Sequence, residues 1–211
     1  MNRYLLYFQL LRNMGMKYFT FRIQYEIRRK GGMLKKVYPV SLENKKYLSL
    51  VEWRSHAMPF FFSNRDSVRS TNTDITLLSE KVNRMLFGEF CFFSSHWYNL
   101  GMDYDWMTNP DTNYKYDSKV HWTEIEDIVA EAGDIKYVWE KSRFSFLYDI
   151  IRYDQESGEN HAAFVFSQIK DWIYKNPLNC GPNYKCSQEI SLRVLNWVFA
   201  LYYYKDSAEL T

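Results

Sequence analysis

The segment HAAFVFSQIKDWIYKNPLNCGPNYKCSQEISLRVLNWVFALYYY, residues 161–204, decides the fold class of this chain. Its apolar residues recur at helical spacing, which predicts one helix over residues 160–175 and another over residues 187–204. Asn176 and Pro177 end the first helix, because proline disfavours helical geometry in the residue before it. The side chains expected to face the core are Phe164, Ile169, Trp172 and Ile173, then Ile190, Val194, Trp197, Val198 and Leu201.

Another helix is predicted immediately before this pair, over residues 136–155. Thr123 and Glu126 fit a capping box, so the helical region is expected to begin near residue 123. Such helix pairs cannot bury their apolar faces alone and must stack on their neighbours. The sequence therefore predicts a mainly α fold of antiparallel helix pairs over residues 123–211. The inward stripe of the helix at 136–155 is expected to contain Tyr137, Phe144, Leu147 and Ile151.

Residues 1–122 are predicted to form an N-terminal helix followed by an irregular arm. A helix over residues 3–30 is indicated by an apolar stripe beside Lys and Arg, and Gly31 and Gly32 end it. For this basic helix, packing against a core is favoured over a membrane-surface role. Within the arm, residues 76–87 favour a short helix, and EFCFF after Gly88 favours a strand or an extended segment. The stripe of the N-terminal helix contains Leu6, Leu10, Met14, Phe21 and Tyr25.

Charge argues against a nucleic-acid partner, and hydropathy argues against a membrane-spanning segment. The net charge is +2, without the strongly basic balance typical of nucleic-acid-binding domains. No stretch approaches the roughly 18 consecutive apolar residues of a membrane span. The N-terminal apolar run is short and lacks a small-residue cleavage site, so no signal peptide is predicted. The chain as written is therefore expected to be cytoplasmic.

The aromatic content of 19% has two interpretations. The favoured one is core packing, and the other is a carbohydrate cleft in which sugar rings stack on aromatic side chains. The histidines are scattered and show no zinc spacing, so neither a metal nor a cofactor is expected. Cys91, Cys180 and Cys186 are odd in number, which argues against a disulfide framework but leaves a bridge between Cys180 and Cys186 open.

GDIKYVWEKSRFSFLYDI, residues 133–150, begins a series of short motifs. Further motifs are D-W-I-x-x-N-P at residues 171–177, G-x-N at residues 181–183 and E-x-x-x-R-x-x-x-W at residues 189–197. An upstream W-x-x-N-P lies at residues 106–110. This ordered set resembles the heparinase II/III-like polysaccharide lyases, although Tyr184 stands where that family usually has Trp.

The resemblance implies a partial (α/α) toroid with a glycan cleft. It also implies β-elimination on uronic-acid glycans of the heparin or alginate type. The family's catalytic Asn-His pair and Tyr would lie beyond Thr211, so no catalytic residue is predicted and the chain is expected to be inactive alone. Asn160–His161 stands in the wrong order, and its favoured interpretation is an N-cap followed by a surface His. Whether the chain is an enzyme is thus left open, and full-length relatives are often periplasmic or secreted.

The candidate substrate-binding residues are Asn183, Tyr184, Arg143, Arg193 and Glu189. A guanidinium is well shaped to pair with a sugar carboxylate. The favoured alternative holds both arginines in structural ion pairs with Glu140 and Glu189. The expected partners are an acidic polysaccharide and the missing C-terminal portion of the same lyase. A non-catalytic glycan-binding or scaffold module is the alternative function.

Overall fold

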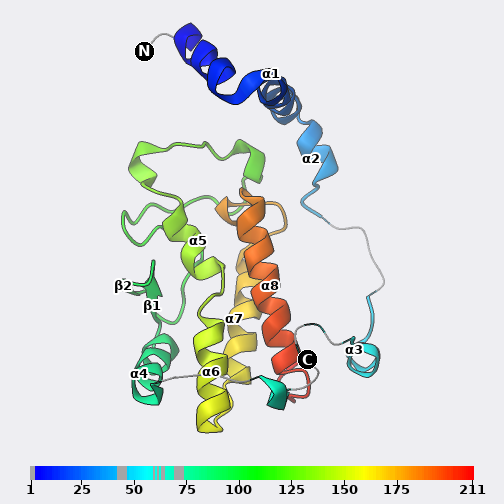
Figure 1. Ribbon diagram of the computed structural model, residues 1–211, viewed down its shortest axis with the longest axis vertical. Helices are drawn as coiled ribbons and strands as arrows, with labels where there is room; N and C mark the ends of the chain where they lie inside the picture. Colours follow the sequence, from blue (N-terminus) through cyan, green and yellow to red (C-terminus); the bar gives the residue numbers. More distant parts are fainter. Residues whose placement is uncertain (1–2, 42–46, 59, 61, 63–64, 69–73) are drawn as a thin grey trace. The chain divides into compact units, whose positions relative to one another are not determined.

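The computed structural model describes residues 3–41, 47–58, 60, 62, 65–68 and 74–211 (Figure 1). The chain divides into two compact units, Met1–Ser41 and Leu42–Thr211. Each unit is described by itself. The boundary expected near residue 122 lies inside the second unit.

The first unit consists of two helices, α1 (Arg3–Lys30) and α2 (Met33–Val37). Gly31 and Gly32 follow α1 as expected, and the N–H of Gly31 donates to the carbonyl of Ile27 at 2.8 Å. The sequence did not predict the break at Gly15, whose φ of 76° and ψ of 161° interrupt α1. The side chains of Leu6, Leu10 and Met14 in the predicted stripe lie outside the described part of the chain.

The second unit is mainly helical, which confirms the mainly α part of the predicted fold class. Its helices are α3 (Leu50–His56), α4 (Ile75–Leu86), α5 (Lys136–Ser142), α6 (Leu147–Ser157), α7 (Ala162–Lys175) and α8 (Ser187–Tyr203). Its strands are β1 (Glu89–Phe92) and β2 (His96–Asn99), paired antiparallel. Short 3-10 turns are η1 (Arg65–Ser67), η2 (Trp122–Glu124), η3 (Ala130–Ala132) and η4 (Pro182–Tyr184).

The segment from α4 to β1 follows the prediction closely. Asp74 caps α4, because its carboxylate accepts from the N–H groups of Thr76 and Leu77 at 3.0 and 3.2 Å. Gly88, with φ 85°, then turns the chain into β1. A Cβ at this position would lie 2.5 Å from the backbone of Gly101, so only glycine fits here.

The long helix predicted over residues 136–155 is in fact two helices, α5 and α6. Phe144 interrupts it with φ 61° and is completely buried. Its ring stacks on Trp106 with a centroid distance of 5.3 Å and an interplanar angle of 13°. Burying this ring overrides the local helical pattern, because a large aromatic contributes more when buried than a few helical hydrogen bonds do.

The capping box predicted at Thr123 does not start an α-helix. Residues 122–124 form only η2, and His121 caps this turn by accepting from the N–H of Thr123 at 3.3 Å. The Thr123 hydroxyl lies within hydrogen-bond distance of His121 Nδ1, at 2.7 Å, and does not cap a following helical turn. The long helices therefore begin at α5 and not near residue 123.

Helices α7 and α8 have the predicted bounds to within two residues. Ile169 and Trp172 of α7 are buried as predicted, but Ile173 is 56% exposed. Of the apolar stripe predicted for α8, Trp197 and Leu201 pack against the core, but Val194 is 49% exposed. The residues that α8 buries are Glu189, Arg193, Asn196, Ala200 and Tyr203.

The main core lies where α6, α7 and α8, which run side by side, meet α4 and β1 (Figure 1). Aromatic rings join these elements. Trp172 of α7 contacts Trp197 of α8 edge-on at 5.2 Å, and Phe90 of β1 contacts Phe146 at 5.0 Å. Core packing, the favoured interpretation of the aromatic content, thus accounts for part of it.

Candidate functional site

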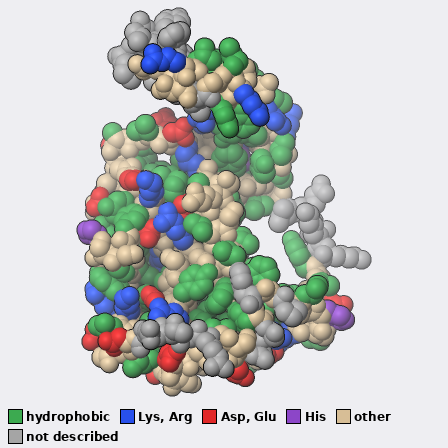
Figure 2. Space-filling model, viewed as in Figure 1, with side chains coloured by type: hydrophobic (Ala, Val, Ile, Leu, Met, Phe, Trp, Pro, Cys, Tyr) green, Lys and Arg blue, Asp and Glu red, His purple; other side chains and the backbone are tan. Residues whose placement is uncertain are grey.

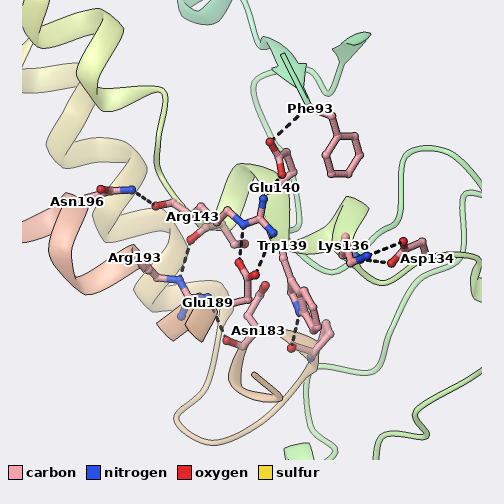
Figure 3. Close-up of polar contacts among 12 residues, drawn as sticks. Phe93, Asp134, Lys136, Trp139, Glu140, Arg143, Asn183, Glu189, Arg193 and Asn196 are labelled. Atoms are coloured by element: carbon pink, nitrogen blue, oxygen red, sulfur yellow. Dashed lines mark hydrogen bonds and ion pairs between the residues drawn. The ribbon is translucent and has the colours of Figure 1, made fainter. Parts of the chain in front are cut away.

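Arg143 joins the end of α5 to the start of α8 (Figure 3). Its Nε and Nη2 donate to the two carboxylate oxygens of Glu189 at 2.6 and 2.9 Å, and its Nη1 pairs with Glu140. The hydrogen bond that Arg143 donates to Glu189 raises the pKa of the guanidinium further above its usual range. This is the bidentate geometry that favours arginine over lysine.

Arg193 lies deeper, with an exposed fraction of 2%. Its Nε donates to the carbonyl of Ser142 at 2.8 Å and its Nη2 to the carbonyl of Asn183 at 3.0 Å (Figure 3). The guanidinium also lies over the ring of Trp172 at 4.1 Å. Burial lowers its pKa to about 10, which still leaves it charged at neutral pH.

Asn183 and Tyr184 lie in η4 and point into the unit. Asn183 is fully buried, and its Nδ2 donates to the carbonyl of Trp106 at 2.9 Å and to Oδ1 of Asn176 at 2.8 Å. Tyr184 is half-buried beside Trp172, with a centroid distance of 5.8 Å. Both residues therefore make their contacts inside the fold.

The structure thus brings the five predicted binding residues together, but in contacts within the fold. Arg143 and Glu189 are paired, Arg193 is held by backbone carbonyls, and Asn183 joins η4 to the segment at Trp106. Their role towards a glycan stays a prediction. These contacts connect α5, η4 and α8.

We expect Arg143 and Glu189 to be energetically coupled. In a double-mutant cycle of Arg143→Met and Glu189→Gln, the interaction energy should be about 0.5–3 kcal/mol, as for residues in one buried network. Urea unfolding of the four proteins measures it. The same cycle for Lys136 and Asp134, whose exposed side chains lie 3.5 Å apart, should give less than about 0.5 kcal/mol. Equal coupling energies for the two pairs would contradict this account.

A separate pocket of about 310 Å³ opens between α4, the β1–β2 hairpin and the α5–α6 segment. Aromatic rings form part of its wall, and lysines, carboxylates and hydroxyls form the remainder. The lining residues are Lys81, Met85, Phe90, Cys91, Phe92, Ser94, Trp97, Glu140, Lys141, Ser145, Phe146 and Asp149. No sequence prediction pointed to this pocket.

Several groups in the pocket wall are fixed by neighbours. Glu140 accepts from the N–H of Phe93 at 3.1 Å through one oxygen and from Arg143 through the other (Figure 3). The guanidinium of Arg84 covers the ring of Trp97 at 3.7 Å and pairs with Glu89 at 2.7 Å. Cation–π contact and ion pair together hold the Trp97 ring in one orientation.

Lys141 is a buried amine among the residues that line this pocket, with an exposed fraction of 4%. Its Nζ lies 4.0, 4.3 and 5.0 Å from the ring centroids of Trp106, Phe90 and Tyr104. Burial lowers the pKa of this amine to about 7, against a smaller opposing effect of Asp171. The aromatic faces offset part of the cost of burying the charge.

The Asn160–His161 pair is also more enclosed than predicted. Asn160 accepts from the N–H of Ala162 at 3.1 Å, as an N-terminal capping residue would. His161, however, is not a surface side chain, because its Nδ1 lies 2.5 Å from the fully buried carboxylate of Asp154. The hydroxyl of Tyr204 donates to the same carboxylate at 2.6 Å, so this cluster ties α6, α7 and α8 together.

The three cysteines are free thiols, which answers the question of a Cys180–Cys186 bridge. Burial raises the pKa of the Cys91 and Cys180 thiols. Among the described residues, no group of three or more His, Cys, Asp or Glu side chains is arranged to hold a metal ion. In the same part of the chain, every helix is too short or too polar to cross a membrane.

Part of the chain is similar to a known protein. Over 103 residues, 49% of this chain, the sequence is 31% identical to the pilus tip adhesin Cpa of Streptococcus pyogenes. The aligned segment covers only 14% of the adhesin's own length. No family model matches the chain, and no solved structure matches it.

These findings overturn the resemblance to heparinase II/III-like lyases. A lyase family model would be expected to match motifs spread over residues 84–201, and none does. The structure supplies a physical reason for the coincidence. The Trp139 indole donates to the carbonyl of Pro182 at 2.9 Å, and Arg143 pairs with Glu189. Trp, Glu, Arg and Asn-Pro at helix ends are residues that any stack of helix pairs can use for such contacts.

Proposed function

We propose that the second unit is a non-catalytic glycan-binding module that takes one sugar unit in the pocket between α4, the β1–β2 hairpin and the α5–α6 segment. The observation that carries the proposal is the composition of the pocket wall. Trp97 is the partly exposed aromatic ring of this wall, Phe90 and Phe146 are core rings that line it, and Lys81 and Asp149 provide charge.

Sugars present apolar C–H faces and a rim of hydroxyls. A site for them therefore combines aromatic rings with polar groups that accept and donate hydrogen bonds. This pocket offers carboxylate acceptors in Glu140 and Asp149, an ammonium donor in Lys81 and a hydroxyl in Ser145. Its volume of about 310 Å³ lies at the small end of ligand sites, which suits a single sugar ring.

The charge of the pocket favours a neutral or amino sugar over a uronic acid. Two carboxylates, Glu140 and Asp149, oppose two amines, Lys81 and Lys141, and burial lowers the pKa of the second amine to about 7. The wall is therefore not the cationic clamp that an acidic polysaccharide needs. Arg143 and Arg193, the candidates for pairing with a sugar carboxylate, make their contacts within the fold.

Three features support binding without chemistry. Burial raises the pKa of the Cys91 thiol, which keeps it in the protonated, weakly nucleophilic form. The Glu140 carboxylate already accepts from Phe93 and Arg143, which leaves it poorly placed to take a substrate proton. The partial similarity to an adhesin also favours a binding function, because adhesion is binding. The proposal requires only α4 to α8 and the hairpin, and it does not depend on an (α/α) toroid.

Glycan binding should depend on Trp97. The chain is tested against a panel of neutral, amino and uronic-acid glycans, and binding is measured by calorimetry and by saturation-transfer NMR. We expect it to bind the neutral and amino glycans. We expect Trp97→Ala to weaken binding at least about tenfold, since one stacked ring contributes about 1–3 kcal/mol in comparable stacking contacts. Tyr174→Ala, on the exposed face of α7, is the matched control and should bind like the wild type.

Two results would count against this function. One is the absence of binding to every glycan in the panel by a folded chain, which favours a scaffold module instead. The other is unchanged binding after Trp97→Ala, which would place the glycan site elsewhere. Circular dichroism of each variant shows that the fold is kept.

A further inference from the structure

The charges of this chain are segregated between its two units. Residues 1–41 contain nine Lys and Arg and a single acidic residue, Glu26, which gives this segment a net charge of +8. The remaining residues contain 18 Lys and Arg against 24 Asp and Glu, a net charge of −6. The overall charge of +2 hides this asymmetry. A strongly basic segment joined to an acidic body is typical of a chain that binds an anionic surface through one end.

The basic unit also carries large apolar side chains that remain exposed. On α1 after Gly15, Met16, Tyr18, Phe21 and Ile27 are each 61–65% exposed. They alternate along the helix with basic residues such as Lys17 and Arg28, both exposed. Single exposed apolar residues are normal on a protein surface, but a run of them on one short helix indicates an interaction site.

After Gly15 the exposed apolar side chains are distributed around the helix, which corrects the single stripe that the sequence predicted. At about 100° per residue, Phe21 and Ile23 lie about 200° apart, on nearly opposite sides. A protein groove or a second copy of the helix could cover only one of these sides. The headgroup region of a lipid bilayer can surround several sides at once, and long Lys and Arg side chains can still reach the phosphates.

The length of the helix determines how it could meet a bilayer. The break at Gly15 leaves a continuous helix of about 15 residues, or about 22 Å at 1.5 Å per residue. This is shorter than the roughly 30 Å hydrocarbon core, and several charges lie along it. A helix of this length and charge is too short to cross the membrane, but it can lie in the plane of the interface.

We propose that the first unit, residues 1–41, binds the surface of a membrane rich in anionic phospholipids, with the α1 segment after Gly15 lying in the headgroup region. Nucleic acid is the other large polyanion that a basic segment could bind. It is disfavoured because Phe21, Ile23 and Ile27 would gain nothing from contact with phosphates.

The test uses the full chain and sedimentation with lipid vesicles. One set of vesicles contains phosphatidylcholine with phosphatidylglycerol, and the other contains phosphatidylcholine alone. We expect the chain to sediment with the first set at low salt, and raising the salt should weaken this binding at least about tenfold, because charge contacts at the surface are screened. Binding to the phosphatidylcholine vesicles should be weaker by a similar factor.

Three variants separate the two contributions. The double variant Phe21→Ser with Ile27→Ser removes apolar contact with the lipid. The double variant Arg28→Glu with Lys30→Glu reverses the charge of two basic positions. Each double variant should reduce vesicle binding at least about tenfold. Lys136→Glu in the second unit, where the side chain is exposed, is the control and should bind vesicles like the wild type. Glycan binding should be unchanged in all of them, so failure of this inference is distinguishable from failure of the proposed function.

Three outcomes would overturn the inference. They are equal binding to both vesicle sets, variants that bind like the wild type, and tighter binding to duplex DNA than to anionic vesicles at the same salt concentration. Self-association through the first unit, seen as a dimer that Phe21→Ser with Ile27→Ser dissolves without any vesicle binding, would likewise replace it. Figure 2 shows basic side chains of this unit beside hydrophobic ones.

Discussion

Replacing Trp106 by alanine should lower the free energy of unfolding by about 3–5 kcal/mol, the range for truncating a fully buried aromatic residue. Trp106 has no exposed surface. Its ring stacks on Phe144 at 5.3 Å, its indole N–H donates to Asp171 at 2.7 Å, and Lys141 lies over it at 4.0 Å. One substitution therefore removes a core contact, a hydrogen bond and one of the aromatic rings around the Lys141 amine.

Urea unfolding followed by circular dichroism measures this effect. Tyr174→Ala is the matched control, because it truncates an aromatic residue that is 86% exposed, and it should change stability by no more than about 0.5 kcal/mol. The loss of stability for Trp106→Phe should lie between those of the two alanine variants, because phenylalanine keeps an aromatic ring but loses the hydrogen bond to Asp171. A loss below about 1 kcal/mol for Trp106→Ala would mean that the packing around Phe144 is not the centre of the core.

The second large effect is expected at Lys141, and it depends on pH. Burial lowers the pKa of this amine from 10.5 in the unfolded chain to about 7 in the folded one. Between these values the unfolded state binds more protons than the folded state, so stability rises as the pH rises. The contribution reaches at most about 1.4 kcal/mol per pH unit, and below about pH 7 the folded state bears the full cost.

Lys141→Met keeps the length of the side chain and removes the charge. At pH 7 we expect it to raise the free energy of unfolding by about 1–4 kcal/mol, as replacing a buried charged group with an apolar one often does. The gain should shrink towards pH 10.5, where the wild-type amine is neutral in both states. Lys136→Met, at an exposed position of α5, is the control. A difference between Lys141→Met and wild type that does not change with pH would contradict the account.

Local signals in the sequence predicted some elements well. Asn176 and Pro177 end α7 as expected, and the turn at Gly158 separates α6 from α7. Gly88 marks the passage from α4 to β1, because its backbone passes too close to Gly101 for any side chain. These boundaries depend on the backbone preferences of individual residues, which can be judged without the rest of the fold.

Features set by tertiary contacts were missed. The break at Phe144 exists because its ring is buried against Trp106, a residue almost forty positions away. The buried face of α8 is partly polar, since Glu189 and Arg193 find partners on α5 and η4. A search for apolar stripes cannot find such a face, because the pattern becomes favourable only once the partners are in place.

The pocket was missed for the same reason. Its wall combines Lys81 of α4, Trp97 of β2 and Asp149 of α6, which no sequence spacing connects. The candidate residues at 183–193 fitted a sequence motif, but in the structure they make contacts between α5, η4 and α8. The one usable signal for the pocket was the charged and aromatic mixture on either side of Gly88.

The central claim is that the pocket binds a sugar and leaves it unchanged. The most direct measurement is a titration of the chain with the best-bound glycan, in which the NMR signal of the Trp97 indole is followed and the glycan is then recovered and analysed. The account predicts a saturable shift of that signal, no such shift of the Trp53 or Trp122 indoles, and a glycan recovered intact. Cleavage of the glycan, or binding that leaves the Trp97 signal in place, would contradict it.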